Sequence, residues 1–229
     1  MAEPLLFFDL DDTLLDHRGA ERAAHEDLFE TKPASFGGVG FDEWLSAYRE
    51  ANAALWASFG RGERTRDEVQ HGRFFDPLAR LGLPTGEADA LGDLYLARYA
   101  ERWRLNEGAE ELLEAASRRG VVGILSNGFR ELQRGKIRRF GLDRWVTVVV
   151  LSEEVGAMKP ARAIFDAAWS AGNGGQKARK VYLGDSFETD VVGAKAAGWF
   201  PVLYNPDGGE VPAPVLHVRR LADAVPLLT

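Results

Sequence analysis

Five short apolar segments alternate with helix-like segments along most of this chain, and this alternation constrains its fold more than any other feature. The first segment is apolar from Leu5 to Phe8 and then reaches an acidic residue, which is typical of a strand buried on both faces. Such alternation favours a parallel, doubly wound α/β sheet, because parallel strands need long crossover connections. We expect strands at residues 5–10, 121–125, 146–151, 181–183 and 200–204, and helices at residues 107–119, 130–140, 161–171 and 189–197.

A long segment without strand-like runs separates the first strand from the second. Its apolar residues recur at helical spacing, as in Phe41, Trp44 and Tyr48. A crossover needs only about a dozen residues, so a segment of roughly ninety predicts a separate, all-helical unit inserted after the first strand. We therefore expect an α/β core of residues 1–15 and 105–229 and a helical cap of residues 16–104.

The composition excludes several classes of protein. The formal net charge of -7 argues against a surface that binds nucleic acid polymers or an anionic membrane. The absence of cysteine excludes disulfides, thiolate nucleophiles and zinc–thiolate sites. No apolar run approaches the roughly 18 residues that span a bilayer, and the first residues lack the positive charge of a signal peptide. We therefore expect a cytoplasmic protein whose partner is a small molecule.

Polar residues follow the expected strands at the point where each one ends. Ligands bind at the carboxyl ends of the strands in open α/β sheets, so these residues are candidates for one shared site. An unpaired buried carboxylate is costly, which argues that Asp9 is more than a turn residue. The candidates are Asp9 and Asp11 after the first strand, Ser126, Asn127 and Gly128 after the second, Lys159 after the third, and Asp185 and Asp190 after the fourth.

Crowded carboxylates repel one another unless a cation lies among them, and oxygen ligands without imidazole or thiolate favour Mg²⁺. A magnesium site beside a lysine, a hydroxyl and backbone amides suits a phosphoryl group. We expect Asp9 to attack phosphorus and form an aspartyl-phosphate, and Asp11 to act as acid and then base. Ser126 and the amides of Asn127 and Gly128 would hold phosphoryl oxygens, and Lys159 would neutralise charge in the transition state.

In their order and spacing these clusters resemble the four motifs of the haloacid dehalogenase-like (HAD) hydrolase superfamily. The helical insertion is similar to the C1-type cap of that superfamily, so the resemblance covers nearly the whole chain. It implies a Rossmann-like core and Mg²⁺ bound by Asp9, the backbone carbonyl of Asp11 and Asp185. It also implies that Asp190 supports these ligands without binding the ion itself. An alternative is that Asp190 only balances the dipole of a helix N-terminus. The matching segments are Asp9–Leu14, Ser126–Gly128, Lys159–Pro160 and Gly184–Asp190.

A closer resemblance links the chain to house-cleaning pyrimidine-nucleotide 5'-nucleotidases, and it implies a phosphomonoesterase of nucleoside 5'-monophosphates. N-acylneuraminate-9-phosphate and phosphoglycolate phosphatases share much of the core, so another small phosphate ester is an alternative substrate. The 2-haloacid dehalogenases lack a carboxylate two residues after the first aspartate, so Asp11 favours phosphate chemistry over halide displacement. A non-catalytic binding protein with the same fold is the third hypothesis. The segments that carry this resemblance are residues 55–56, 70–74, 127–129, 152–156 and 164–166.

Two residues of the cap, Trp56 and Arg73, are candidates for binding the part of the substrate beyond the phosphate, with Gln70 beside them. The alternative is that Trp56 belongs to the core of the cap and that Arg73 forms an ion pair on its surface. The basic run 134–139 predicts one exposed helix face, and not a nucleic-acid patch.

Overall fold

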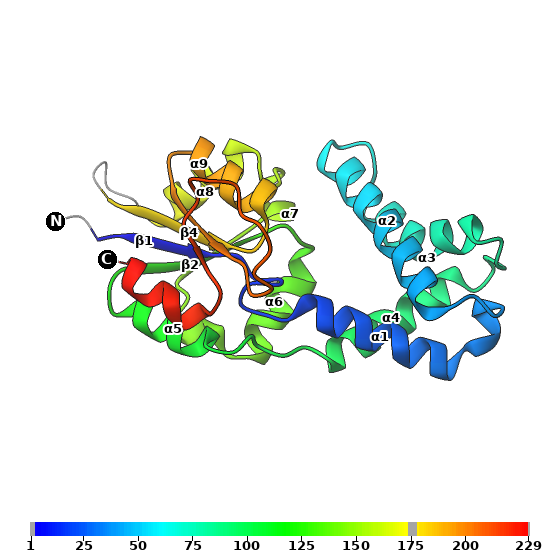
Figure 1. Cartoon of the computed structure of the whole chain (residues 1–229). Helices are drawn as coiled ribbons and strands as arrows, with labels where there is room; N and C mark the ends of the chain where they lie inside the picture. The colour runs from blue at the N-terminus through cyan, green and yellow to red at the C-terminus, as the bar shows by residue number, and fades with distance from the viewer. Residues whose placement is uncertain (1–2, 174–177, 229) are drawn as a thin grey trace. The chain divides into compact units, whose positions relative to one another are not determined.

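The computed structural model describes residues 3–173 and 178–228 of the chain. Contacts between residues divide the chain into two compact units, which are Met1–Asp16 with Arg104–Thr229, and His17–Trp103. Among the described residues, the strands of the sheet belong to the first unit, and the second unit consists of helices (Figure 1).

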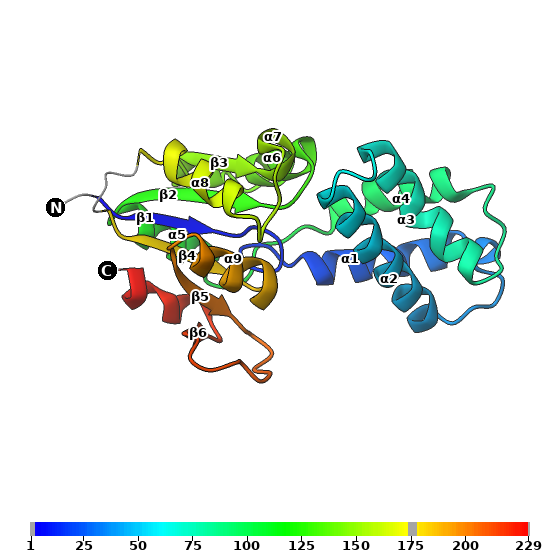
Figure 2. The ribbon, with the colours of Figure 1, turned by 90° about the horizontal axis from the view of Figure 1, so that it is seen from above.

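A six-stranded parallel sheet forms the centre of the first unit (Figure 2). The strand order is β3-β2-β1-β4-β5-β6, so the chain winds outward from β1 in both directions. The predicted doubly wound parallel sheet is therefore confirmed, and the short edge strand β6 is an addition to it. The strands are β1 (Leu5–Phe8), β2 (Val121–Ser126), β3 (Val148–Leu151), β4 (Lys180–Gly184), β5 (Phe200–Tyr204) and β6 (His217–Val218).

Helices connect the strands and cover both faces of the sheet. The helix predicted at residues 189–197 differs in detail, because a π-helical segment, η3 (Phe187–Val192), precedes the short helix α9 (Gly193–Ala196). Ser186 caps η3, since its hydroxyl accepts a hydrogen bond from the backbone N–H of Thr189. The other helical segments of this unit are α5 (Ala109–Ser117), α6 (Arg130–Arg139), η2 (Leu142–Arg144), α7 (Ser152–Val155), α8 (Arg162–Ala171) and η4 (Leu221–Leu228).

Successive residues of β1 point to opposite faces of the sheet and supply two hydrophobic cores. Leu6 and Phe8 pack in a core with residues of α5 and η4. Leu5 and Phe7 pack in the other core, with residues of α8 and α9. Burial on both faces explains why β1 is apolar at every position, and it fixes the strand end that carries Asp9.

Four α-helices and a short 3-10 helix make up the second unit. Its third helix begins with a capping box, in which the Thr65 hydroxyl accepts from the N–H of Glu68 and the Glu68 carboxylate accepts from the N–H of Thr65. None of the helices in the described residues has the length and apolar character that crossing a membrane requires. The elements are α1 (His17–Thr31), η1 (Pro33–Phe36), α2 (Phe41–Gly60), α3 (Arg66–Arg80) and α4 (Ala88–Glu101).

Aromatic rings form the core of this helical unit. His25 lies at the centre of the cluster, with its ring centroid 4.2 Å from that of Tyr48 and 4.8 Å from that of Tyr95. Its Nδ1 accepts a hydrogen bond from Nε1 of Trp44 at 3.1 Å. Burial lowers the pKa of His25 to about 3, so the imidazole is neutral at physiological pH. The helical unit thus has a hydrophobic core of its own.

Candidate active site

Three carboxylates meet at the carboxyl ends of two neighbouring strands. Asp9 follows β1, Asp185 follows β4, and Asp190 lies in η3 just beyond. One oxygen from each of the three lies within 4.8 Å of the others. Since β1 and β4 are paired in parallel, their ends reach the same edge of the sheet and bring these side chains together.

Lys159 is buried between two of these carboxylates. Its Nζ donates hydrogen bonds to Oδ1 of Asp9 and to Oδ1 of Asp190, both at 2.6 Å. Burial by itself lowers the pKa of Lys159, but Asp190 and Asp9 outweigh it and raise the pKa above its usual value. The lysine therefore stays charged and stabilises two carboxylates that would otherwise be buried without a cation.

The ionisation of Asp9 depends on its surroundings. Burial raises the pKa of Asp9 well above its usual range, the Lys159 ammonium opposes that rise, and Asp190 and Asp185 add to it. Lys159 occupies only Oδ1 of Asp9. Among the described residues no hydrogen bond to Oδ2 is present, so this second oxygen is open to a ligand.

Tyr182 is a member of the site that the sequence analysis did not identify. Its hydroxyl accepts a hydrogen bond from Nζ of Lys159 at 2.9 Å and lies 3.0 Å from the backbone oxygen of Leu125. Burial, Asp190 and Asp9 all raise the pKa of Tyr182, so the phenol stays protonated. The only sign in the sequence is a tyrosine in the middle of a buried strand, since a buried hydroxyl needs polar partners.

Close packing against a glycine fixes Asp190. A Cβ atom added at Gly184 would lie only 2.4 Å from Cγ of Asp190, so no other residue fits at the end of β4 without a shift. Oδ2 of Asp190 accepts a hydrogen bond from the backbone N–H of Ser186 at 2.9 Å. The carboxylate is thus held by Lys159 on one oxygen and by backbone on the other, which is more than a helix-end charge requires.

Asp11 belongs to a second polar network. Nζ of Lys136 donates to its Oδ1 at 2.6 Å, and Nε2 of Gln133 donates to its Oδ2 at 2.8 Å. The same Gln133 amide also donates to Oγ of Ser126 at 2.8 Å. The side chain of Asp11 is therefore held by two groups from α6.

The prediction of one exposed basic face for residues 134–139 is wrong at Lys136, whose side chain is 1% exposed. Gln133, Lys136 and Ile137 form the buried stripe of α6, at the i, i+3, i+4 spacing of a helix face. That spacing is the one signal that could have separated Lys136 from its exposed neighbours. The basic run by itself does not show this burial, because charged side chains on a helix are usually exposed.

Asn127 positions the loop that carries Lys159. Its Nδ2 donates to the backbone oxygen of Lys159 at 2.9 Å, and its Oδ1 accepts from the Lys159 N–H at 2.8 Å. The Lys159–Pro160 peptide bond that follows is cis. Gly128 lies against Gln133, because a Cβ at this position would be 2.5 Å from Nε2. The side chain of Asn127 is thus used within the protein, which leaves only its backbone amide for a ligand.

The structure places Trp56 and Arg73 in the helical unit. Trp56 is half-buried on α2, with its ring in edge contact with that of Phe59 at 5.7 Å. Arg73 is buried on α3 and is not the surface ion pair that the alternative interpretation expects.

The carboxylate cluster fits a hard divalent cation. Its candidate ligand atoms are all carboxylate oxygens, which Mg²⁺ prefers. Lys159 brings one positive charge to Asp9 and Asp190. The three carboxylates together with this lysine therefore keep a net negative charge that attracts a metal. Of the candidates, Asp9 and Asp185 could bind the ion, while Asp190 already has both oxygens in hydrogen bonds.

Comparison with known protein families shows which family the chain belongs to. The model of the haloacid dehalogenase-like hydrolases matches residues 4–198. The chain belongs to this family. The resemblance to this family that the sequence predicts is therefore confirmed.

Curated relatives cover the chain almost completely. Pyrimidine 5'-nucleotidase YjjG of Escherichia coli is 31% identical over 97% of this chain and 96% of its own length. Phosphoserine phosphatase of Thermus thermophilus is 34% identical over 96% of both chains. This HAD hydrolase is thus similar to enzymes whose names state different phosphorylated substrates.

Solved structures agree with the fold. The putative HAD-hydrolase YfnB of Bacillus subtilis, solved with bound magnesium, is 28% identical, with a TM-score of 0.79 and full coverage of both chains. L-2-haloacid dehalogenase of Xanthobacter autotrophicus has a TM-score of 0.74 and covers 100% of this chain and 98% of its own. At 18% identity the dehalogenase shows the shared fold alone.

Proposed function

We propose that this HAD hydrolase is a Mg²⁺-dependent phosphomonoesterase that acts through an aspartyl-phosphate, with a nucleoside 5'-monophosphate as its substrate. The observation that carries the proposal is the buried group of Asp9, Lys159 and Asp190, with Asp185 beside it. This group presents Oδ2 of Asp9 next to the buried ammonium of Lys159. That arrangement suits attack on a phosphoryl group, since it combines a nucleophile with charge stabilisation.

Asp9 is the proposed nucleophile. Lys159 holds Oδ1, so Oδ2 attacks phosphorus and the bond between phosphorus and the ester oxygen breaks. The Lys159 ammonium stabilises negative charge that develops on the phosphoryl oxygens. A bound Mg²⁺, held by Asp9, Asp185 and the backbone carbonyl of Asp11, would supply further neutralisation of that charge.

Asp11 is the proposed acid and base. It gives a proton to the departing ester oxygen, and in the second step it takes a proton from the water that attacks the acyl phosphate. That second attack breaks the bond between phosphorus and Oδ2 of Asp9 and releases inorganic phosphate. Lys136 and Gln133 each donate to one oxygen of Asp11, so one of these hydrogen bonds has to break before that oxygen can carry the proton, while the other bond keeps the carboxyl in place.

Ser126 and the backbone amides of Asn127 and Gly128 are the proposed contacts of the phosphoryl oxygens. The Ser126 hydroxyl is oriented by Gln133. In this proposal residues 1–15 and 105–229 form the catalytic domain, and residues 16–104 form a cap that selects the leaving group. Trp56 and Arg73 are the cap residues proposed to contact it.

Relatives support the phosphatase class and leave several leaving groups open. Two of these relatives are named pyrimidine 5'-nucleotidases, and others are named for ribulose-1,5-bisphosphate, phosphoserine and glyceraldehyde 3-phosphate. The nucleotide is favoured because two of these relatives, at 31% and 27% identity, share the name of pyrimidine 5'-nucleotidase, whereas the phosphoserine phosphatase at 34% identity makes phosphoserine the main alternative. Halide displacement is disfavoured because Asp11 is present and is built into a network with Lys136.

Release of inorganic phosphate from nucleoside monophosphates, sugar phosphates, phosphoglycolate and phosphoserine, measured with Mg²⁺ and with EDTA, tests the proposal. We expect chelator-sensitive turnover led by nucleotides. Asp9→Asn should reduce turnover below detection, whereas the exposed control Asp143→Asn should leave it unchanged. Substantial phosphate release by Asp9→Asn would refute the aspartyl-phosphate mechanism. Faster turnover of an ester other than a nucleotide would overturn the proposed substrate and leave the proposed mechanism in place.

A further inference from the structure

Two groups of the proposed site share the side-chain amide of Gln133. Its Nε2 donates hydrogen bonds to Oδ2 of Asp11 and to Oγ of Ser126, both at 2.8 Å. Gln133 is 1% exposed, so both bonds lie in a buried environment where hydrogen bonds are strong. An amide NH₂ group has two hydrogens, and these two bonds use both of them.

The Asp11 carboxylate determines which end of the amide faces it. This carboxylate accepts hydrogen bonds from Nζ of Lys136 and from Gln133, so it selects Nε2 of Gln133 over the oxygen Oε1. Within residues 3–173 and 178–228, Oε1 is left buried without a hydrogen-bond partner. A reversed amide would place that oxygen against the carboxylate, which is less favourable still. The orientation of the amide is therefore fixed.

This orientation decides how the Ser126 hydroxyl is used. The hydroxyl has one hydrogen, and because its oxygen accepts from Gln133, that hydrogen points away from Gln133. In the part of the chain that the structure describes, the hydroxyl donates to no other group. Its hydrogen is thus available to an acceptor on a bound molecule. The N–H of Gln133 also polarises the hydroxyl, which makes it a better donor.

Gly128 leaves room for the Gln133 side chain. A Cβ atom at Gly128 would lie 2.5 Å from Nε2 and 2.7 Å from Cδ of Gln133, so a larger residue would displace the amide from Ser126. The backbone N–H of Gly128 is itself a proposed contact of the phosphoryl oxygens. The hydroxyl and a backbone amide that would bind the phosphoryl group therefore both lie against one glutamine.

We propose that Gln133 is a positioning residue of the phosphoryl site. One N–H of its amide turns the hydrogen of Ser126 toward a phosphoryl oxygen, and the other holds Asp11. Gln133 itself touches no reacting atom in this proposal and acts through Ser126. The inference rests on the proposed phosphatase function, because that function places a phosphoryl group beside Ser126.

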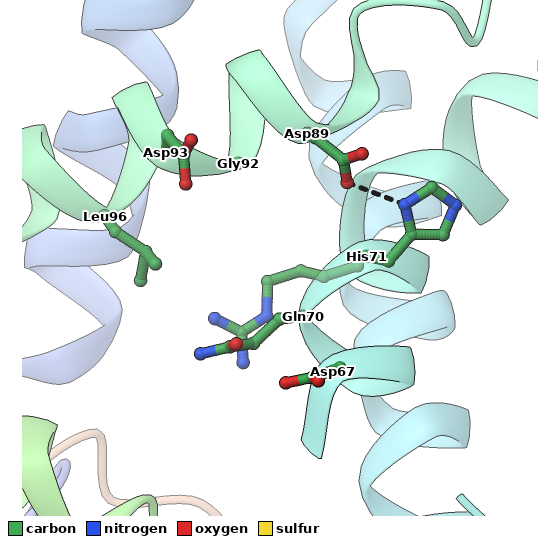
Figure 3. Close-up of a pocket in the computed structure, with 8 residues that line it drawn as sticks. Asp67, Gln70, His71, Asp89, Gly92, Asp93 and Leu96 are labelled. Carbon is green, nitrogen blue, oxygen red and sulfur yellow. Dashed lines mark hydrogen bonds and ion pairs between the residues drawn. The ribbon is translucent and has the colours of Figure 1, made fainter. Parts of the chain in front are cut away.

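Inorganic phosphate is the probe for binding, since it has phosphoryl oxygens and no leaving group. Its affinity does not depend on the proposed contacts of the leaving group in the helical unit, where Arg73 lines a cavity of about 430 Å³. Figure 3 shows Gln70 of α3 and Asp93 of α4 lining the same cavity. Phosphorus NMR titration of the full chain with Mg²⁺ measures the affinity without turnover.

The value of kcat/KM for p-nitrophenyl phosphate is the second readout. Its leaving group is weakly basic and needs little help from an acid, so this value depends on Ser126 more than on Asp11. The variants are Gln133→Met, which removes both hydrogen bonds at similar volume, Ser126→Ala, and the double variant. Arg138→Met is the control, because it removes an exposed polar side chain from the same helix.

We expect wild type and Arg138→Met to bind phosphate alike, and Gln133→Met to bind it roughly 3- to 10-fold more weakly. Ser126→Ala should lose at least about 10-fold. In the Ser126→Ala background, Gln133→Met should change kcat/KM by less than about 2-fold, because no hydroxyl is left to orient. An equal loss in both backgrounds would show a merely structural role and overturn the proposal.

Thermal unfolding shows whether each variant folds. If Gln133→Met does not, Gln133→Glu keeps the shape of the side chain and places an acceptor against Ser126. Its loss should be smaller in the Ser126→Ala background, where no hydrogen can be diverted, and an equal loss would overturn the proposal.

Failure of this inference differs from failure of the proposed function. If the wild-type chain hydrolyses phosphate esters and Gln133→Met matches it in phosphate affinity and kcat/KM, the positioning role is wrong and the phosphatase stands. If phosphate affinity depends on Gln133 through Ser126 but no ester is hydrolysed, the positioning role stands and the proposed function is wrong.

Discussion

Replacing Lys159 with methionine removes the cation that Asp9 and Asp190 share. Both hydrogen bonds from Nζ are 2.6 Å long, and the lysine side chain is 3% exposed. Methionine retains most of the apolar volume, so the change is chiefly electrostatic. The variant keeps two buried carboxylates side by side, and a third, Asp185, lies within 4.8 Å.

Breaking a buried ion pair from one side costs about 3–5 kcal/mol. For a chain of this length that corresponds to a fall of about 6–20 °C in Tm. The cost should depend on pH. Burial is the main cause that raises the pKa of Asp9, and Lys159 is the group that opposes it, so the variant should have a still higher Asp9 pKa.

The sign of the pH effect follows from proton binding. Above about pH 4 the unfolded chain has released the Asp9 proton, while the folded variant retains it up to its raised pKa. In that window the folded variant binds more protons than the unfolded chain, so its stability falls as pH rises. We expect the deficit relative to wild type to be smaller near pH 5 than near pH 8.

Urea unfolding in EDTA at both pH values measures this effect, and the chelator matters because a bound divalent cation would also neutralise the carboxylates. The exposed Lys195→Met is the matched control and should change stability by less than about 0.5 kcal/mol. A Lys159→Met variant as stable as wild type at both pH values would refute the reasoning, because the three carboxylates would then need no cation.

Three further predictions test the second network and the packing. Lys136→Met should lower kcat by about 10- to 100-fold with little change in KM, because Asp11 loses a group that orients it, and unchanged steady-state kinetics would contradict this. Gly123→Ala should destabilise by about 1–3 kcal/mol, since its Cβ would lie 2.3 Å from the Phe7 ring. Gly92→Ala on α4, whose Cβ would meet nothing closer than 3.6 Å, should instead stabilise by about 0.5–1 kcal/mol, and urea unfolding compares the two.

The sheet could be predicted from the sequence because its strands are short, apolar and separated by helical patterns. β1 is the clearest case, since Leu5–Phe8 is buried at every position. The position of the candidate site followed from the same rule, because parallel strands end at one edge and Asp9 and Asp185 stand directly after β1 and β4. Strand β6 could not be predicted, since two residues carry no periodic signal.

The hydrogen-bond partners of the site residues could not be predicted, because these bonds join residues that are far apart in the sequence. Lys136 lies 125 positions from Asp11, and Tyr182 lies 23 positions from Lys159. Arg73 shows the same limit, since spacing alone could not tell a buried arginine from a surface one. Local patterns report which face of an element is apolar, whereas a buried charge is placed by its distant partner.

The two polar networks meet at consecutive residues of one strand end. Ser126 bonds to Gln133 in the network of Asp11, and Asn127 bonds to the backbone of Lys159 in the network of Asp9. A shift of this strand end would therefore move Lys159, which holds the proposed nucleophile, together with Gln133, which holds the proposed acid. Groups linked in this way are not energetically independent, so losses from single substitutions in the two networks should not add in a double variant. In the proposed mechanism, the end of β2 would thus couple the attack on phosphorus to the proton transfer that accompanies it.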